Sequence, residues 1–333
     1  MKKIIFAFLI FTGIVSGQNQ FTEINSFPGA FSRMGFGSRG MGMGNAMSAV
    51  ITGNLVSYYN PALSVFQKGN AFQIGYSILS LDRSLNFLNF TKKFDFTKRQ
   101  RSGKIGSRRH SAGISIGIIN SGVSNIDGRD GSGKKLGDLS TSENQVFLSF
   151  SNRFSEKFAL GAALKLYYFK LFRDITSTAF GLDVGVLYLI NKRFTVSASI
   201  SDINTKYKWD TGSIYGENGN FTTNKFPLLK KIGFSYHIAQ PNLTAAFEFE
   251  NSNASTNYIR FGIEYEIYSN LFVRSGLDKL NLSNFDAPVR PSVGFSYSYN
   301  SGSWTIGVDY AFVWEPYTVT NDQHILGLTF NLN

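Results

Sequence analysis

The sequence predicts an all-β fold, a transmembrane antiparallel β-barrel of about 14 strands with an N-terminal plug inside it. Three features predict this fold: a secretory signal, a glycine-rich segment after it, and a long series of residues that alternate between apolar and polar. The chain of 333 residues is 15% aromatic, although its mean hydropathy is only -0.08. A barrel accounts for both values, because only every second residue faces lipid and aromatic side chains gather at the membrane interfaces.

Residues 1–17 have the composition of a secretory signal peptide. Two lysines precede the apolar run Ile4 to Ile14, and small residues stand just before Gln18. The apolar run is too short to anchor the chain in a membrane. We therefore expect an exported chain in the outer membrane of a Gram-negative bacterium, with a cleaved signal at 1–17, a plug at 18–69 and the barrel at 70–333.

The barrel region consists of segments in which every second residue is apolar. In Ser303 to Phe312, large apolar residues alternate with small or polar ones, and Leu326 to Asn333 repeats the pattern. A soluble β-sandwich has the same alternation, so the connections must distinguish the two. Short turns alternate with longer polar links such as Ser121 to Ser142 and Ile203 to Phe226. This rhythm is typical of outer-membrane barrels, and an even number of strands places both ends of the barrel in the periplasm.

Charged residues occupy the polar face of several strands in the middle of the series. An unpaired charge in a plugged lumen is costly, so we expect these residues to form ion pairs with one another and not a catalytic acid/base pair. The predicted lumen charge network consists of Lys165, Asp183, Lys231, Glu248, Glu250, Arg260, Glu264, Glu266, Arg274 and Asp309. The other inward residues of the alternating strands from Phe194 to Asn333 are mostly Ser, Thr and Gly, which argues against an apolar passage through the lumen.

The glycine-rich segment is the compact, non-repetitive element that such a barrel encloses. Its predicted plug motif consists of Gly37, Arg39, Gly40, Gly42, Gly44, Asn60 and Pro61. The stretch from Gly37 to Ala46, followed by Asn54 and by Tyr59-Asn60-Pro61-Ala62, resembles the N-terminal signature of the FadL-like outer-membrane barrels, and within them of the PorV/PorQ group. In that superfamily a glycine-rich segment ending in Asn-Pro-Ala forms a hatch inside the barrel.

The resemblance implies two functions. Similarity to the PorV/PorQ group implies a non-enzymatic component of the type IX protein secretion machinery of Bacteroidetes, which handles exported cargo at the outer membrane. Similarity to the wider FadL-like group implies the alternative, a transporter of hydrophobic small molecules. The expected partners are outer-membrane lipid or lipopolysaccharide, proteins of the secretion translocon and, for the alternative, a hydrophobic small ligand.

No motif predicts catalysis, a cofactor or a metal. The stretch from Gly35 to Gly40 matches a dinucleotide-binding pattern but lacks the strand before it and the helix after it. Ser115 matches a nucleophile motif, yet it lies inside an alternating run and not at a sharp turn. The three histidines lack metal-ligand spacing, and the sequence has no cysteine. The sequence therefore predicts a protein that is not an enzyme and holds no cofactor.

A basic run extends from Lys92 to Arg109, with Asp95 as its one acidic residue, and contributes much of the net charge of +11. A nucleic-acid partner is not expected for an exported chain. A solvated loop or a surface facing anionic lipid head groups fits better. The number of strands before the run would place it in the periplasm, although the sequence alone leaves its side of the membrane open.

Overall fold

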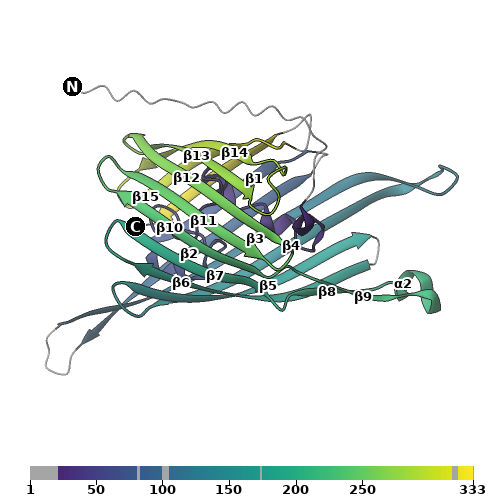
Figure 1. Ribbon diagram of the computed structural model, residues 1–333, viewed down its shortest axis with the longest axis horizontal. Coiled ribbons are helices and arrows are strands. Elements are labelled where there is room, and N and C mark those ends of the chain that lie inside the picture. The colour runs from purple at the N-terminus through teal and green to yellow at the C-terminus, as the bar shows by residue number, and fades with distance from the viewer. Residues whose placement is uncertain (1–21, 81–82, 100–104, 173–174, 317–321, 333) are drawn as a thin grey trace.

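Fourteen antiparallel strands close into a barrel in the computed structural model, as the sequence predicts (Figure 1). The structure describes residues 22–80, 83–99, 105–172, 175–316 and 322–332. Strands follow one another around the barrel in chain order, and β1 pairs with β16 to close it. The barrel strands are β1 (Asn70–Ile78), β2 (Ser84–Arg99), β3 (Ile105–Arg129), β4 (Lys135–Arg153), β5 (Phe158–Phe172), β6 (Ile175–Leu189), β7 (Phe194–Ile203), β10 (Leu229–Ile238), β11 (Leu243–Ser252), β12 (Thr256–Tyr268), β13 (Leu271–Asn281), β14 (Arg290–Asn300), β15 (Trp304–Val313) and β16 (Gln323–Leu332).

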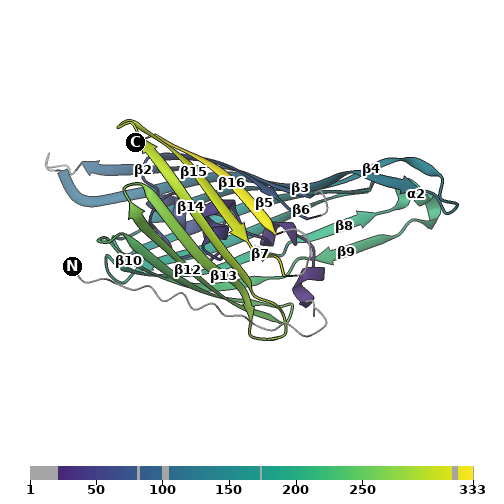
Figure 2. The ribbon, with the colours of Figure 1, turned by 90° about the horizontal axis from the view of Figure 1, so that it is seen from above.

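Two hairpins extend beyond the barrel in the same direction (Figures 1 and 2). One is formed by β8 (Lys206–Asp210) and β9 (Phe221–Lys225), which pair with each other and carry α2 (Gly212–Tyr215) and η4 (Gly216–Asn218). The other is the far end of β3 and β4, whose pairing continues to Arg129 and Lys135. The long polar links predicted at these two places are therefore largely ordered β-structure.

The two ends of the barrel differ in their connections. Asn70 pairs with Leu332, so the first and last strands meet at one end. Tight turns join the strands at this short-turn end, at 154–157, 190–193, 239–242, 269–270 and 301–303. The opposite, long-loop end carries the two extended hairpins. The basic run from Lys92 belongs to the hairpin of β2 and β3 at the short-turn end, where the side chains of 97–110 lie outside the described part.

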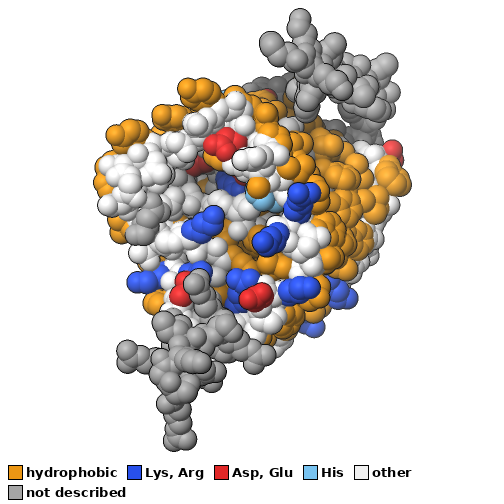
Figure 3. Space-filling model, turned by 90° about the vertical axis from the view of Figure 1, so that its left-hand side faces the viewer, with side chains coloured by type: hydrophobic (Ala, Val, Ile, Leu, Met, Phe, Trp, Pro, Cys, Tyr) orange, Lys and Arg blue, Asp and Glu red, His pale blue; other side chains and the backbone are white. Residues whose placement is uncertain are grey.

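The outer surface of the barrel is apolar and the lumen holds the charges. On β1, Phe72, Ile74 and Tyr76 are 37%, 47% and 49% exposed, and they alternate with inward residues. Figure 3 views the short-turn end, with Lys and Arg gathered on it and hydrophobic side chains along the flank. Glu248 and Arg260 are buried inside. The predicted orientation is confirmed, because a soluble sandwich would place these charges in water.

Residues 22–69 run through the lumen from the long-loop end to the short-turn end. They form η1 (Glu23–Ser26), η2 (Phe31–Arg33), α1 (Gly37–Gly42) and η3 (Pro61–Phe66). At the long-loop end, Ile24 packs in one cluster with Leu229 and Tyr258 of the barrel. No helix in the described part of the chain is long and apolar enough to cross a membrane. The predicted signal peptide lies outside the described residues.

Candidate functional site

The candidate site is the contact between the plug and the inner wall, and η3 forms one side of it. Asn60 caps η3, because its Oδ1 accepts a hydrogen bond from the Ala62 amide at 2.9 Å, and Pro61 occupies the first turn. Asn60 also donates to the carbonyl of Val186 in the wall at 3.2 Å. A Cβ added at Gly161 of β5 would lie 2.4 Å from the Pro61 carbonyl carbon. Backbone therefore meets backbone here, and only glycine leaves enough room.

The end of α1 meets the wall on another side of the lumen. Gly44 has a φ of +58°, and a Cβ added at Gly276 of β13 would lie 2.1 Å from the Gly44 nitrogen. Gly276 is paired with Gly262 of β12, so two wall glycines face the plug together. Within the plug, a Cβ at Gly40 would lie 2.0 Å from the Tyr59 hydroxyl. Close backbone approach thus explains Gly44, Gly262 and Gly276, and the Tyr59 side chain leaves no room for a Cβ at Gly40.

The two remaining motif glycines bound α1. Gly37 has a φ of +69°, in the left-handed region that favours glycine. A Cβ added there would meet no atom within 4 Å, so the backbone conformation and not the space explains this glycine. A Cβ added at Gly42 would lie 3.4 Å from the Cβ of Ala311, a distance at the short end of ordinary van der Waals contact. α1 packs against β13 to β16 and has no side chain larger than Arg39 and Met41. Its small residues allow the helix to lie directly on the wall.

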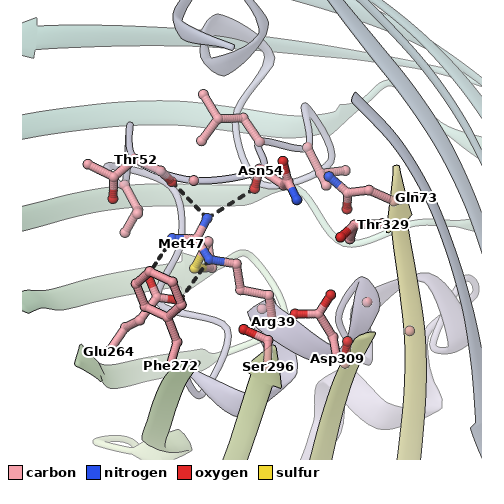
Figure 4. Close-up of a pocket in the computed structure, with 18 of the residues that line it drawn as sticks. Arg39, Met47, Thr52, Asn54, Gln73, Glu264, Phe272, Ser296, Asp309 and Thr329 are labelled. Carbon is pink, nitrogen blue, oxygen red and sulfur yellow. Dashed lines mark hydrogen bonds and ion pairs between the residues drawn. The ribbon is translucent and has the colours of Figure 1, made fainter. Parts of the chain in front are cut away.

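Arg39 joins α1 to the wall and to the following loop (Figure 4). Its Nε and Nη2 donate to the two carboxylate oxygens of Glu264 at 2.9 and 2.7 Å. Its Nη1 donates to the carbonyl oxygens of Thr52 and Asn54 at 2.8 and 3.0 Å. Burial opposes the charge on Arg39, but the Glu264 carboxylate more than compensates, so the pKa of Arg39 lies above its ordinary value. Arg274 binds the same carboxylate from the wall, with Nε 2.6 Å from Oε2.

A second cluster of charges surrounds Arg260 on β12. Its Nε donates to Asp278 at 2.7 Å, and its Nη atoms donate to Glu248 at 3.1 Å and to Glu250 at 3.2 Å. Lys231 lies 3.4 Å from Glu250 and 4.0 Å from Glu248. Arg260 is 5% exposed. Each nitrogen of this buried guanidinium therefore donates to a carboxylate, and these carboxylates compensate its charge.

Nine of the ten predicted network residues take part in buried ion pairs. Besides the two clusters above, Lys165 lies 2.8 Å from Asp183 and 3.1 Å from Asp202, and Arg274 lies 3.3 Å from Asp309. Glu266 is the exception. It lies at the short-turn end, where its Oε1 accepts a hydrogen bond from the backbone amide of Asn270 at 2.8 Å, and it has no ion pair among the described residues.

Two members of the network, Asp202 and Asp278, escaped sequence analysis. Asp202 is out of phase with the alternation of β7, whereas Asp278 continues the inward-facing series of Arg274 and Gly276 just before a break. Asp202 has a φ of 61° beside the register shift between β6 and β7. Asp278 precedes Lys279, which has a φ of 59° beside the register shift between β12 and β13. A β-bulge changes which residues face inward, and nothing in the period-two pattern marks where it occurs.

The wall around Phe87 and Phe147, across the plug from Glu264, is partly apolar and has no ion pair to the plug among the described residues; we call it the uncharged side. Phe36 of the plug packs on Phe87 of β2 and Phe147 of β4, with ring centroids 5.0 and 5.9 Å apart. Ile119 of β3 and Leu187 of β6 are buried with them. The prediction of mostly Ser, Thr and Gly concerns the strands from Phe194 onward and does not cover this part of the wall. The plug carries large apolar side chains, and these require apolar partners in a dry interior.

Two cavities flank the plug. The outer cavity, of about 400 Å³, opens toward the long-loop end and is lined by apolar Phe31, Met34 and Leu79 and by Lys279 and Arg290, among others. The inner cavity, of about 470 Å³, lies toward the short-turn end (Figure 4). Its lining combines apolar residues, including Phe36, Leu63 and Phe87, with Arg39 and polar residues of the turns.

The described residues include no arrangement typical of catalysis or metal binding. Ser115 Oγ donates to the Asn89 amide oxygen at 2.9 Å and lies 2.9 Å from the Thr91 hydroxyl, so its neighbours include no general base. No group of three or more His, Cys, Asp or Glu in the described part could hold a metal ion.

No protein-family model and no curated protein matches this sequence. Solved structures do match. The toluene transporter TbuX of Ralstonia pickettii gives a TM-score of 0.57 at 11% identity, covering 90% of this chain and 99% of that one. The fold is that of the FadL-type outer-membrane barrels. The toluene transporter TodX of Pseudomonas putida gives 0.54 at 13% identity over 95% and 98%, and a FadL homologue of Pseudomonas aeruginosa gives 0.53 at 11% over 89% and 98%.

At these identities the likeness concerns the fold alone. It supports the resemblance to the FadL-like barrels, whereas none of these structures is described as a PorV, PorQ or secretion protein. Two of the three are named as toluene transporters.

Proposed function

We propose that this chain is an outer-membrane channel for small apolar molecules. One observation carries the proposal: a single cluster of buried apolar side chains reaches from the outer cavity to the inner one. Phe31 and Leu79 of this cluster line the outer cavity, and Phe36, Leu63 and Phe87 line the inner cavity. Apolar surface is thus continuous past the plug on its uncharged side. The fold shared with toluene transporters supports this proposal.

The contacts along this cluster are of a kind that an apolar molecule can replace. Phe36 meets Phe87 and Phe147 in ring contacts, not in hydrogen bonds or ion pairs. A small aromatic molecule that enters between these rings exchanges one apolar contact for another. Passage on the charged side would instead separate buried ion pairs such as Arg39 and Glu264, which is strongly destabilising. We therefore place the route on the uncharged side.

Uptake of a labelled apolar molecule tests the proposal. Cells that lack such a channel and express this chain would take up labelled toluene faster than cells with an empty vector. Equal initial rates in the two strains, with the barrel present in the outer membrane, would contradict the proposed function.

A pair of lysine substitutions tests the route. Met34 is half-buried and lines the outer cavity against the apolar cluster, while Asn25 lines the same cavity but is exposed. We expect Met34→Lys to abolish the faster uptake. An apolar molecule that passes the new ammonium group must displace its hydrating water, which costs free energy. Asn25→Lys, which adds the same charge to the same cavity, would leave uptake near that of the wild type. Equal effects of the two would contradict the route.

The role in type IX secretion remains a separate hypothesis, based on the resemblance of the plug motif to the PorV/PorQ group. No contact in the structure favours it over the channel. Deletion of the gene followed by measurement of exported proteins tests it. Lost export would support the secretion role, and normal export together with slower toluene uptake would support the channel.

A further inference from the structure

A series of small cavities links the outer cavity to the inner one on the charged side of the plug. The outer cavity shares Tyr258 and Lys279 with a cavity of about 20 Å³. That cavity shares Glu250 and Arg260 with a cavity of about 30 Å³. The second small cavity in turn shares Tyr59 with the inner cavity. We call this series the polar seam.

The lining of the polar seam suits water and not an apolar molecule. Arg33 lines both small cavities, together with Glu250 and Arg260, and Lys165 and Asp202 line the second. A cavity of this size with several polar partners holds about one water molecule. The polar seam is therefore too narrow for an aromatic ring, and its chemistry differs from that of the apolar cluster across the plug.

We infer that the polar seam is a second, water-filled path through the barrel, closed to ions by Arg260 at one narrow point and by Tyr59 at another. This inference goes beyond the proposed channel for apolar molecules and does not depend on it. It concerns the other side of the plug and a different class of solute.

Arg260 closes the polar seam sterically. Its guanidinium lies between the two small cavities and binds Glu248, Glu250 and Asp278 at 2.7 to 3.2 Å. Without it, these three carboxylates keep Lys231 as their one ion-pair partner among the described residues. Arg33, Lys165, Lys231 and Lys279 also line the small cavities, so loss of Arg260 widens the narrow point without leaving a lining of excess carboxylate.

Tyr59 closes the second narrow point. Its hydroxyl accepts a hydrogen bond from the Phe36 amide at 2.9 Å and lies 2.8 Å from Asn45 Oδ1. These bonds hold the ring between the second small cavity and the inner cavity. Burial raises the pKa of the Tyr59 phenol well above its ordinary value, so the residue contributes bulk and no charge.

Conductance of the full-length protein in a planar lipid bilayer tests the inference. We expect the double variant Tyr59→Ala/Arg260→Gln to show a steady K⁺ conductance that the wild type lacks. Each single variant would remain closed, because one narrow point persists. A folded double variant that does not conduct would overturn the inference, and conduction by either single variant would overturn the arrangement of two narrow points.

The double variant Tyr59→Ala/Arg274→Gln is the matched control. Arg274 is buried like Arg260 and binds two carboxylates, Glu264 and Asp309, where Arg260 binds three, but it lines the inner cavity beyond Tyr59. We expect this variant to stay closed, because Arg260 is retained. Conduction equal to that of the first double variant would show a general loosening of the plug and overturn the inference.

A measurement on the wild-type protein covers the case in which the first double variant does not fold. A high-resolution crystal structure should show ordered water in both small cavities, hydrogen-bonded to Arg260 or Glu250. Dry cavities would overturn the inference without any substitution. Toluene uptake by the wild type is independent of this result, so failure of the polar seam and failure of the proposed channel are distinguishable.

Discussion

Different interactions hold the two sides of the plug against the wall. On the side of β2 to β6, η3 and Phe36 fit the wall by shape, with backbone against Gly161 and ring against ring at Phe87. On the side of β10 to β16, α1 is held by ion pairs around Glu264. Shape tolerates replacement by another apolar group of similar size, whereas a buried ion pair does not tolerate loss of one partner. The difference suggests which side yields to a passing molecule.

The largest effect is expected on the charged side, for Glu264→Ala. This change leaves Arg39 and Arg274 buried without the carboxylate they share. Removal of one partner from a buried ion pair costs about 3–5 kcal/mol of unfolding free energy. Urea titration of the barrel in detergent or lipid vesicles measures the loss.

Glu266→Ala is the matched control for Glu264→Ala. Glu266 lies two residues further along β12, at the short-turn end, and its carboxylate accepts hydrogen bonds from the Asn270 amide and the Asn242 side chain but forms no ion pair among the described residues. We expect its loss to cost about 1 kcal/mol or less. If the two substitutions destabilised the barrel equally, burial of the ion pair would not be what holds α1.

The next effect is expected on the shape side, for Gly161→Ala. The added Cβ would lie 2.4 Å from the plug backbone at Pro61, so η3 must move away from β5. Overpacking of this kind costs about 1–3 kcal/mol of unfolding free energy. Gly131→Ala on the exposed hairpin, where a Cβ meets no atom within 4 Å, is the control and should change little. A Gly161→Ala barrel as stable as the wild type would mean that η3 is loosely seated.

Sequence analysis predicted which way a residue faces, but not which side of the plug it meets. Phe87 and Glu264 both point inward, and alternation identifies each, because lipid and lumen select opposite side chains. Their contacts depend on the path of residues 22–69 through the lumen. That path is set by long-range contacts, such as Gly44 against Gly276, which leave no local pattern.

The sequence also does not predict how far from the end of the barrel an inward residue lies. Glu264 and Glu266 share a face of β12, yet one is buried in the network and the other lies at the rim. The period of two is the same at every depth. Aspartates at bulges, such as Asp202, were missed for the complementary reason, because a bulge shifts the phase of the alternation.

A smaller effect is expected for Asn60→Ala at the start of η3. The change removes the acceptor for the Ala62 amide and the donor to Val186. Loss of a helix cap costs about 1 kcal/mol of unfolding free energy. Asn60→Ser keeps a capping oxygen and should recover part of the loss in the same urea titration. If Ser and Ala destabilised the barrel equally, the bond to the wall and not the cap would be the main contribution of Asn60.

The smallest effect is expected for an ion pair outside the barrel. Lys135 and Asp138 on the extended hairpin lie 2.7 Å apart, the same distance as Arg39 and Glu264. The exposed pair has side chains that are 55% and 56% exposed, so water and salt screen its attraction and Lys135→Ala should change the unfolding free energy by about 0.5 kcal/mol or less.

The dependence on salt concentration distinguishes the exposed ion pair of Lys135 from the buried one of Glu264. Raising the salt concentration should erase the small effect of Lys135→Ala and leave the effect of Glu264→Ala nearly unchanged, because buried charges are poorly screened. Urea titrations at low and high salt measure both. Equal salt sensitivity of the two variants would mean that solvent reaches Glu264 in the lumen. The charged side would then yield to small solutes as readily as the apolar side, and the contrast between the two sides of the plug would be lost.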